Sequence, residues 1–246
     1  MITVSIITKN EEDNIEKCLE SIKWADEIII VDSGSTDNTI DICKKYNCKI
    51  ITTKWLGFGK TKQIGVNASR NNWILSVDAD EIITENLKHD ILNKITSTTY
   101  SGFHIKRISY YLNKRINYSS WQTDHPLRLF NKKYGNFNNK NVHESVDIIG
   151  EVSHIRSHLK HYPFPNIKTH IIKINLYSEL GAQNLYDENK TTSLLYALAS
   201  GWIKFFKMYM LKRGFLDGKE GLILALLSGF SSTLKYLKLW VMSKNR

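Results

Sequence analysis

The chain has 246 residues, of which 42% are hydrophobic and 24% are charged. This length and composition suffice for a large domain with an apolar core, and they exclude a wholly disordered chain. The formal net charge is +10, and the segment 199–246 carries nine Lys or Arg residues against two Asp or Glu. A basic segment of this kind is typical of contact with nucleic acid, with an anionic membrane, or with solvent alone.

Cysteine usage and the first residues indicate a cytoplasmic protein. Cys18, Cys43 and Cys48 form neither a paired framework nor a Cys-x-x-Cys metal spacing, which favours a reducing compartment. The opening sequence MITVSIITKNEE begins a strand at once, without a basic leader or a cleavage site. We therefore expect no secretory signal.

Strand-like and helix-like segments alternate in the first part of the chain. Short apolar runs occupy 2–8, 26–32, 48–53 and 73–78, and segments with helical character lie between them, such as 11–24 with Ile15, Leu19 and Ile22. Strands that lack polar alternation are buried on both faces, and strand–helix repetition implies a parallel sheet with right-handed crossovers. The pattern predicts a Rossmann-like α/β fold with a mostly parallel sheet.

The pattern changes after residue 99. Residues 100–162 are aromatic, β-like and rich in loops, and the chain reads as helical beyond Pro163 and Pro165, over 167–186, 191–212 and 217–242. We predict one domain over 1–165, with halves 1–98 and 99–165, and a helical extension over 166–246 that packs on it.

Polar clusters follow three of the predicted strands. They are Thr8, Asn10 and Glu11; Asp32, Ser33 and Gly34; and Asp78 with Asp80. Ligands of parallel α/β sheets bind outside the carboxyl ends of the strands, so we expect these clusters to converge on one crevice.

The stretch WILSVDADE, residues 73–81, ends a buried strand with three carboxylates. On a regular strand Asp78 and Asp80 would share a face, whereas a turn after the strand would divide them between two partners. Paired carboxylates suit Mg²⁺ or Mn²⁺, which also bind phosphates. In the alternative interpretation Asp78 caps the turn and Glu81 is solvated. No P-loop or G-x-S-x-G motif occurs, and GFGK at 57–60 is only a partial dinucleotide fingerprint.

Three stretches of the sequence resemble family 2 glycosyltransferases with the GT-A fold. They are VSIITKNEEDNIEKCLESIKWADEIIIVDSGSTDNT, WLGFGKTKQIGVNAS and WILSVDADE. Later stretches are similar to the bacterial lipopolysaccharide-core branch, described as β-1,4-glucosyltransferases of lipooligosaccharide: HPLRLFNK, NVHESV, HLKHYPFPN and RGFLDGKEGLILALL. The resemblance covers nearly the whole chain and implies inverting transfer of a sugar from a nucleotide diphosphate.

The resemblance also implies roles for individual residues. Thr8, Asn10 and Glu11 would line the nucleotide pocket. Asp32 would contact the nucleotide's base, Lys62 would contact the nucleotide, and Asp78 would contact the ribose. Asp80 would bind the metal that bridges the diphosphate. The half 1–98 would bind the nucleotide and the half 99–165 the acceptor. Asn10 and Glu11 could instead start a helix, and Lys62 could be solvated.

Inverting transfer requires a carboxylate that takes the proton of the acceptor hydroxyl. The candidates beyond the nucleotide half are Asp124, Glu144, Asp147 and Glu151. Glu144 lies in a VHE triplet that the branch shares, and Asp124 precedes HPLRLF. We expect Glu144 to be the base, with Asp124 as the second candidate.

Histidines near these carboxylates suggest two further roles. We expect His143 to orient Glu144, and the resemblance implies that His161, at an HY position of the family, approaches the metal. His154, His158 and His161 have the spacing of one helical face, but they lack an acidic or cysteine partner, so we expect no zinc site.

The C-terminal part combines apolar and cationic stretches. GLILALLSGFSSTL, residues 221–234, is uncharged for fourteen residues, which is shorter than the roughly 20 residues that span a bilayer. GWIKFFKMYMLKR, residues 201–213, is typical of a helix in the headgroup region of an anionic membrane. The alternative is a helix pair with solvated lysines.

Together these inferences predict a metal-dependent, inverting hexosyltransferase. The expected donor is UDP-glucose, the cofactor Mg²⁺ or Mn²⁺, and the acceptor a lipid-linked saccharide of the lipopolysaccharide core. We expect a peripheral protein on the inner face of a bacterial plasma membrane, without a nucleic-acid partner. The alternatives are transfer to another surface polysaccharide, a basic nucleic-acid-binding protein, and an inactive sugar-nucleotide-binding protein.

Overall fold

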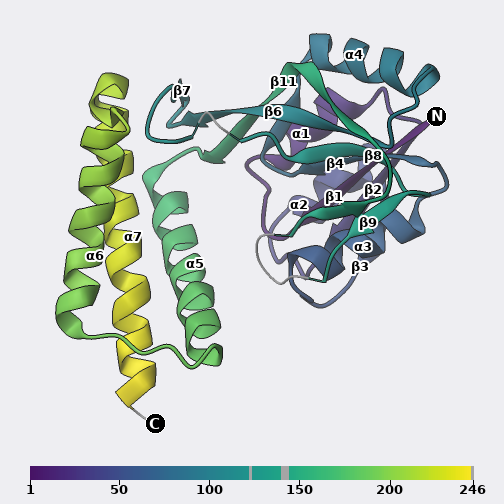
Figure 1. The fold of residues 1–246 in the computed structure, drawn as a ribbon. Helices are drawn as coiled ribbons and strands as arrows, with labels where there is room; N and C mark the ends of the chain where they lie inside the picture. The colour runs from purple at the N-terminus through teal and green to yellow at the C-terminus, as the bar shows by residue number, and fades with distance from the viewer. Residues whose placement is uncertain (122–123, 140–143, 245–246) are drawn as a thin grey trace. The chain divides into compact units, whose positions relative to one another are not determined.

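The computed structural model describes residues 1–121, 124–139 and 144–244 (Figure 1). The chain forms two compact units. Unit 1 comprises Met1–Ile108 and Asp124–His161, and unit 2 comprises Ser109–Thr123 and Tyr162–Arg246.

Unit 1 begins with four parallel strands. They are β1 (Ile2–Thr8), β2 (Glu27–Asp32), β3 (Lys49–Thr52) and β4 (Trp73–Asp78), in the spatial order β3-β2-β1-β4. The central strand β1 is almost wholly buried, as expected for a strand that is covered on both faces. The register pairs Thr8 with Asp32 and Ile7 with Asp78, so β1, β2 and β4 end at one edge of the sheet.

The sheet continues beyond β4 with strands from the aromatic, β-like part of the sequence. β8 (Leu127–Asn131) pairs antiparallel with β4, and β6 (Gly102–Tyr111), β11 (Val152–Phe164) and β5 (Glu81–Ile83) follow in order. A separate antiparallel hairpin joins β9 (Gly135–Phe137) and β10 (Val146–Ile148). The predicted α/β fold class is confirmed: the sheet is parallel in its first half and mixed as a whole.

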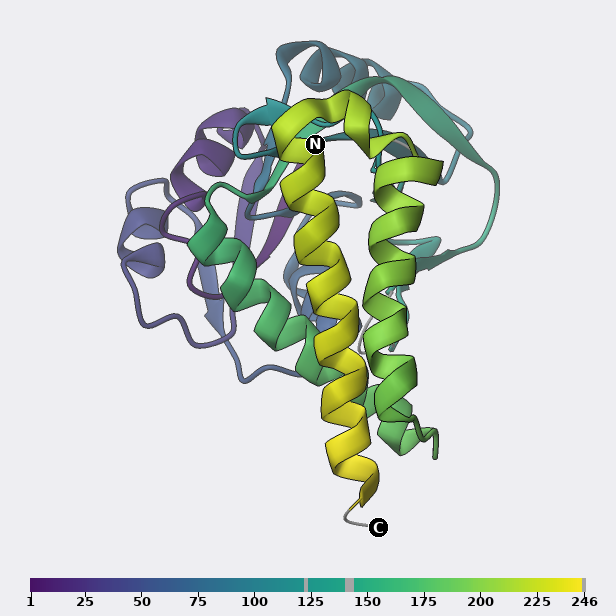
Figure 2. The same ribbon diagram turned by 90° about the vertical axis from the view of Figure 1, so that its left-hand side faces the viewer.

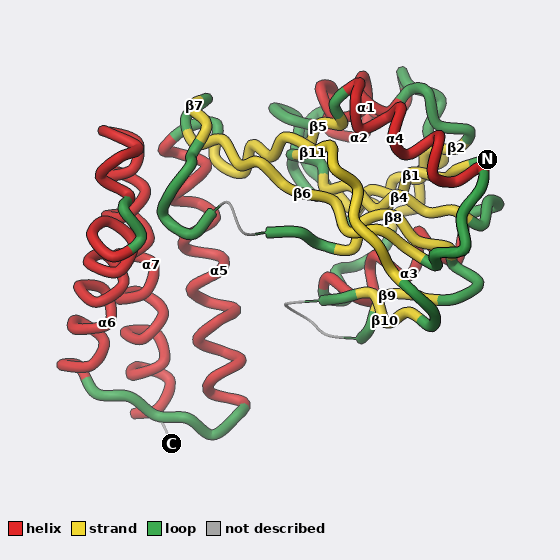
Figure 3. Tube along the Cα trace, turned by 45° about the horizontal axis from the view of Figure 1, so that its top comes forward, coloured by secondary structure: helices red, strands yellow, loops and turns green. Residues whose placement is uncertain are grey.

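Helices cover both faces of the parallel strands (Figure 3). α1 (Ile15–Ile22), α2 (Thr39–Lys44) and α4 (Glu85–Thr96) contribute to one apolar core, and α3 (Phe58–Ala68) packs on the opposite face. The close approach of α3 depends on Gly65, where a Cβ atom would lie 2.1 Å from Ser5 Oγ and 3.2 Å from Val31 Cγ2. Gly65 therefore fixes α3, and with it Lys62, close to the strands.

Unit 2 consists mainly of three long helices. They are α5 (Ile167–Asp187), α6 (Leu194–Phe206) and α7 (Gly218–Lys244), with the π-helical turn η1 (Lys207–Leu211), the 3-10 turn η2 (Gly214–Asp217) and the short strand β7 (Lys114–Arg115). α7 contacts both α5 and α6 (Figure 2). Asn166 and Ser193 cap α5 and α6, since their side chains accept hydrogen bonds from Thr169 N and Tyr196 N. These helices agree closely with the helical segments predicted from the sequence.

Small residues allow α6 and α7 to pack closely. A Cβ atom on Gly201 would lie 2.0 Å from Thr233 Oγ1 and 2.9 Å from Gly229 O, and a Cβ atom on Gly229 would lie 2.8 Å from Gly201 O. Any larger side chain at either glycine would push the helices apart.

The structure corrects the expected helical face of histidines. His154, His158 and His161 lie on strand β11, and a regular strand places His161 on the face opposite to the other two. The prolines that follow them therefore mark the end of a strand and not the end of a helix.

One helical segment among the described residues, Gly214–Lys244, is long and apolar enough by length and composition alone to cross a membrane. It extends at both ends beyond the uncharged stretch 221–234, and it includes Lys235, Lys238 and Lys244.

Candidate active site

The carboxyl edge of the parallel strands gathers several of the predicted site residues. Thr8 and Asp32 end adjacent strands in register, and Asp78 ends β4 next to Ile7. Lys62 on α3 reaches the same edge through an ion pair with Asp78. The predicted convergence of distant polar residues is therefore present within unit 1.

Asp32 organises the turn that follows β2. Its carboxylate accepts hydrogen bonds from Gly34 N and Ser35 N, both at 3.0 Å, and from Ser35 Oγ at 2.5 Å. Gly34 has a φ of +88°, which only glycine adopts without cost. The buried carboxylate thus has partners within the turn, and its expected contact with the base stays a prediction.

The loops after β1 and β2 are linked by Asn10 and Glu11. Asn10 Oδ1 accepts a hydrogen bond from Thr36 N at 2.8 Å, and Glu11 N donates to Thr39 Oγ1 at 2.9 Å. Starting a helix is not the whole role of these residues, because α1 begins later, at Ile15. Their polar groups instead hold two site loops together.

Two buried hydroxyls at this edge have no hydrogen-bond partner in the part of the chain that the structure describes. Thr8 Oγ1 and Ser33 Oγ make no hydrogen bond with any described residue, although each residue is only 5% exposed. Buried polar groups are normally hydrogen-bonded, and leaving one unsatisfied costs about 1–3 kcal/mol. Unsatisfied hydroxyls at the carboxyl ends of parallel strands are suited to a bound polar ligand.

Lys62 joins two carboxylates from distant parts of the chain. Its Nζ atom lies 3.0 Å from Asp78 Oδ1 and 2.8 Å from Glu144 Oε1, and its side chain is 6% exposed. Asp78 also contacts the guanidinium of Arg128. Partial burial of Asp78 opposes its charge, but Arg128 and Lys62 outweigh this and hold the pKa of Asp78 well below its usual value.

Glu81 is the buried centre of the same network. It has no exposed surface, its Oε1 atom lies 2.6 Å from Arg128 and 3.4 Å from Arg107, and its Oε2 atom accepts a hydrogen bond from Asp78 N at 2.9 Å. The alternative of a solvated Glu81 is therefore wrong. Burial opposes the charge of Arg128, but Asp78 and Glu81 outweigh it and raise the pKa of Arg128.

Sequence reasoning assigned no role to Arg107 or Arg128. The available signal was the position of Arg128 inside the apolar run LRLF, because an arginine in a buried strand requires a charged partner. The partner of Arg128 could not be read from the sequence, since Glu81 is 47 residues away.

The two candidate bases have different surroundings. Asp124 contacts Arg107 and its side chain is 43% exposed, whereas Glu144 contacts Lys62 and its side chain is 18% exposed. Asp124 and Glu144 therefore connect to the same network through different cations. His143, expected to orient Glu144, lies outside the described residues.

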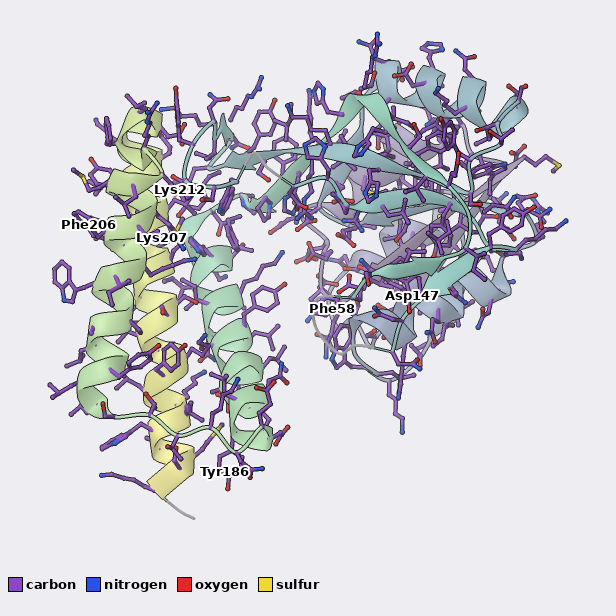
Figure 4. All side chains as sticks on the ribbon, viewed as in Figure 1. Phe58, Asp147, Tyr186, Phe206, Lys207 and Lys212 are labelled. Atoms are coloured by element: carbon purple, nitrogen blue, oxygen red, sulfur yellow. The ribbon has the colours of Figure 1, made fainter. Side chains whose placement is uncertain are left out.

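The other candidate carboxylates are exposed. Asp147 lies on β10, where it is labelled in Figure 4, and Glu151 follows this hairpin. Among the described residues, neither forms an ion pair with Lys62, Arg107 or Arg128.

Asp78 and Asp80 have different partners. Asp78 contacts Lys62 and Arg128, whereas Asp80 Oδ1 lies 3.5 Å from His161 Nε2. The pairing of β11 with β5 places His161 beside Glu81, which brings the histidine to the aspartates. The turn after β4 thus divides the two aspartates between two partners.

Asp80 is the carboxylate that the resemblance assigns to a divalent cation, and His161 lies 3.5 Å from it. Within the described ranges, no group of three or more His, Cys, Asp or Glu side chains is arranged to hold a metal ion. Mg²⁺ is commonly bound by one or two carboxylates together with substrate phosphates, so Asp80 fits a cation that arrives with a diphosphate.

Comparisons with known proteins agree with this architecture. The family described as "Glycosyl transferase family 2" matches residues 3–152. An uncharacterized glycosyltransferase of Rickettsia typhi is 31% identical over 97% of this chain and 86% of its own length. The lipopolysaccharide core biosynthesis glycosyltransferase LpsC of Rhizobium meliloti is 26% identical over 92% of this chain and 90% of its own length.

Solved structures share the fold at low sequence identity. S. aureus TarS 1–349 in complex with UDP aligns with a TM-score of 0.51 and 16% identity, covering 99% of this chain and 91% of that one. Its complex with UDP-GlcNAc aligns with the same TM-score. The shared α/β architecture is the GT-A fold that the sequence resemblance implied. On the family match and the Rickettsia relative, the chain belongs to glycosyltransferase family 2.

Proposed function

We propose that this transferase moves glucose from UDP-glucose to a saccharide of the lipopolysaccharide core, with inversion at the anomeric carbon and with a divalent cation bound. The observation that carries the proposal is the position of Lys62 between Asp78 and Glu144. It connects a carboxylate at the nucleotide edge of the sheet with a carboxylate from the acceptor half.

The donor nucleotide would bind at the carboxyl edge of β1 and β2. Thr8 Oγ1 and Ser33 Oγ supply buried hydroxyls without partners among the described residues. Asp32, Asn10 and Glu11 hold the adjoining loops in place. The TarS structures that share this fold hold UDP and UDP-GlcNAc, which supports a uridine nucleotide here.

The charge balance of the network supports a cation beside the diphosphate. Three cations, Lys62, Arg107 and Arg128, are matched by four carboxylates, Asp78, Glu81, Asp124 and Glu144. The network therefore offers no surplus positive charge to a diphosphate. Asp80 and His161 would hold Mg²⁺ or Mn²⁺, which would neutralise the charge that develops on the leaving nucleotide.

Glu144 would act as the base on the acceptor. In this role its carboxylate takes the proton of the attacking hydroxyl as that oxygen bonds to the anomeric carbon and the bond to the diphosphate breaks. Lys62 holds Glu144 at 2.8 Å and so fixes its position relative to Asp78. Asp124 is the second candidate, and its contact with Arg107 places it at the other end of the network.

The proposed acceptor is supported by the name of one relative. The relative LpsC is named for lipopolysaccharide core biosynthesis, which supports a core saccharide carried on lipid. An acceptor of this kind would bring the protein to an anionic membrane surface on the cytoplasmic side.

The direct test is a panel of sugar nucleotides, each measured with Mg²⁺, with Mn²⁺ and with EDTA, for its effect on the melting temperature. A ligand that binds the folded state raises apparent stability by mass action, by about 2.7 kcal/mol at 100 times its Kd. We expect UDP-glucose with a cation to give the largest shift, and UDP alone a smaller one. A shift with RNA and with no sugar nucleotide would refute the proposal.

A further inference from the structure

α6 and the turn after it carry large apolar side chains that are open to solvent. Leu195 is 79% exposed, Trp202 74%, Leu211 66%, Ile203 64% and Phe206 54%. Figure 4 shows Phe206 on the side of α6 away from α7. Single exposed apolar residues are ordinary, but a contiguous group on one helix marks an interaction surface. We call these five residues the α6 surface.

The residues that α6 buries are small. They are Ala197, Ser200 and Gly201, and Gly201 lies against α7 at the close approach described above. A helix of a soluble protein normally buries its large apolar residues and exposes polar ones. α6 has the opposite pattern, so its outward face is not explained by the packing of unit 2.

Basic residues lie on and directly after α6, in the same segment as the α6 surface. The segment 194–216 contains Lys204, Lys207, Lys212 and Arg213 and no Asp or Glu. All four are exposed, and none forms an ion pair with a carboxylate among the described residues. In contrast, Lys238 on α7 pairs with Glu179 at 2.8 Å.

We propose that the α6 surface docks on an anionic lipid surface, with α6 lying in the headgroup region and its lysines toward the lipid phosphates. Apolar area and unpaired cations on one segment are what an interfacial helix requires. A second copy of the chain is a poorer occupant, because it would bring four more unpaired cations to the same segment.

The contacts of α7 favour a helix that stays with its neighbours. Lys238 Nζ also donates to Asn175 O on α5 at 2.9 Å, and Ser232 Oγ donates to Ser200 Oγ on α6 at 3.3 Å. A crossing by α7 alone would break these contacts and would expose Lys238 to lipid. The protein thus lies on the membrane and does not span it.

The experiment measures binding of the full chain to sedimented vesicles of phosphatidylglycerol with phosphatidylethanolamine, and to vesicles of phosphatidylcholine alone. We expect binding to the anionic vesicles at low salt and release at about 1 M salt, where the screening length falls to about 3 Å. Binding to the neutral vesicles should be weak.

Two variants test the two components of the surface. Trp202→Ser with Phe206→Ser removes apolar contact, and the quadruple glutamine variant of Lys204, Lys207, Lys212 and Arg213 removes charge. Each basic residue near an anionic surface contributes about 1 kcal/mol, so we expect the quadruple variant to bind at least about tenfold more weakly. The apolar variant should show a similar loss.

Matched controls replace similar residues elsewhere in the chain, to show whether vesicle binding depends on the α6 surface itself. Ile172→Ser with Leu176→Ser removes apolar residues that are 59% and 53% exposed on α5. A second control replaces four exposed cations of unit 1, Lys17, Lys45, Lys133 and Arg156, with glutamine. Both should bind vesicles much as wild type does. Circular dichroism and UDP binding establish that every variant is folded.

Fluorescence locates the surface directly. Brominated lipids should quench part of the tryptophan emission of wild type, and the conservative variant Trp202→Phe should lose that part while it still binds. Equal vesicle binding by wild type and both surface variants would overturn the proposal. If only detergent releases wild-type protein from the vesicles, a helix spans the membrane. If the protein forms dimers without lipid and the apolar variant does not, the α6 surface binds a second copy of the chain. Vesicle binding needs no donor, so failure here leaves the transferase proposal intact.

Discussion

Lys62 and Glu144 are 82 residues apart in the chain, yet their Nζ and Oε1 atoms lie 2.8 Å apart. Because Lys62 also binds Asp78 at 3.0 Å, one cation positions a carboxylate of each half of the proposed site. Because the two carboxylates, Asp78 and Glu144, come from different halves, each can be replaced separately to test its own role.

The first prediction concerns the base. Glu144→Gln keeps the shape of the side chain but removes its ability to take a proton, so we expect turnover to fall by about 10²-fold or more. Affinity for the donor, measured by calorimetry, should change little. Asp124→Asn is the matched variant, and it should retain most of its activity. If Asp124→Asn is inactive and Glu144→Gln is active, the two assignments must be exchanged.

The second prediction concerns the cation. Asp80→Asn removes the charged ligand while Asp78 keeps its contacts with Lys62 and Arg128. We expect loss of transfer and loss of the Mn²⁺-dependent increase in donor affinity, with an unchanged melting temperature of the free protein. Asp78→Asn, in comparison, should weaken donor binding and also lower stability, because Arg128 loses a partner. Full activity of Asp80→Asn, or of wild type in EDTA, would contradict the metal assignment.

The sequence predicted the fold and the convergence of polar residues at one edge of the sheet. Buried strands such as 2–8 and 73–78 lack polar alternation. This pattern can be recognised in the sequence without knowing how the side chains pack. The sequence alone could not predict Glu81 as a buried centre, because its environment depends on Arg128 and Arg107 from strands β8 and β6. The local sequence pattern shows which side chains are polar. Which of these polar side chains are buried depends on the pairing of strands that lie far apart in the sequence.

The histidines of β11 illustrate the same limit. Their spacing fits a helix as well as a strand, and only the pairing of Leu159, Lys160 and His161 with β5 determines the strand. That pairing also brings His161 to Asp80. The resemblance to the family suggested that His161 approaches the metal, which stays a prediction. The helices of unit 2 were easier to predict, since Asn166 and Ser193 provide local start signals.

The third prediction concerns the stability of the buried network. Glu81→Gln leaves the guanidinium of Arg128, which is 4% exposed, with one carboxylate instead of two. Removing one partner of a buried ion pair costs about 3–5 kcal/mol in the free energy of unfolding. Glu85→Gln, which breaks an exposed pair with Lys88, should cost less than about 1 kcal/mol. Urea denaturation measures both, and equal effects would show that the network contributes no special stability.

The fourth prediction concerns the pH dependence of unit 2. His170 is buried against Phe164, and its Nδ1 atom lies 2.9 Å from Tyr111 Oη. Burial lowers the pKa of His170 from 6.5 to about 4. The unfolded chain therefore binds a proton at a higher pH than the folded chain does. Stability from this residue is complete above pH 6.5 and is lost as the pH falls toward 4.

Comparison with His170→Phe isolates this effect. Between pH 7.5 and pH 5 wild type should lose about 2 kcal/mol more unfolding free energy than the variant, because each pH unit between 6.5 and 5 costs about 1.4 kcal/mol. Asp78 contributes a separate loss below its unfolded pKa, at lower pH, and it is common to both proteins. Parallel pH profiles of wild type and variant would contradict a neutral buried His170.

The most direct measurement is transfer of labelled glucose from UDP-α-glucose to a truncated lipopolysaccharide core, with NMR of the anomeric centre of the product. We expect a β-linked product that forms with wild type and Mg²⁺ or Mn²⁺, forms about 10²-fold more slowly with Glu144→Gln, and does not form with Asp80→Asn. An α-linked product would contradict inversion. Equal rates for wild type and both variants would contradict the assignment of this site.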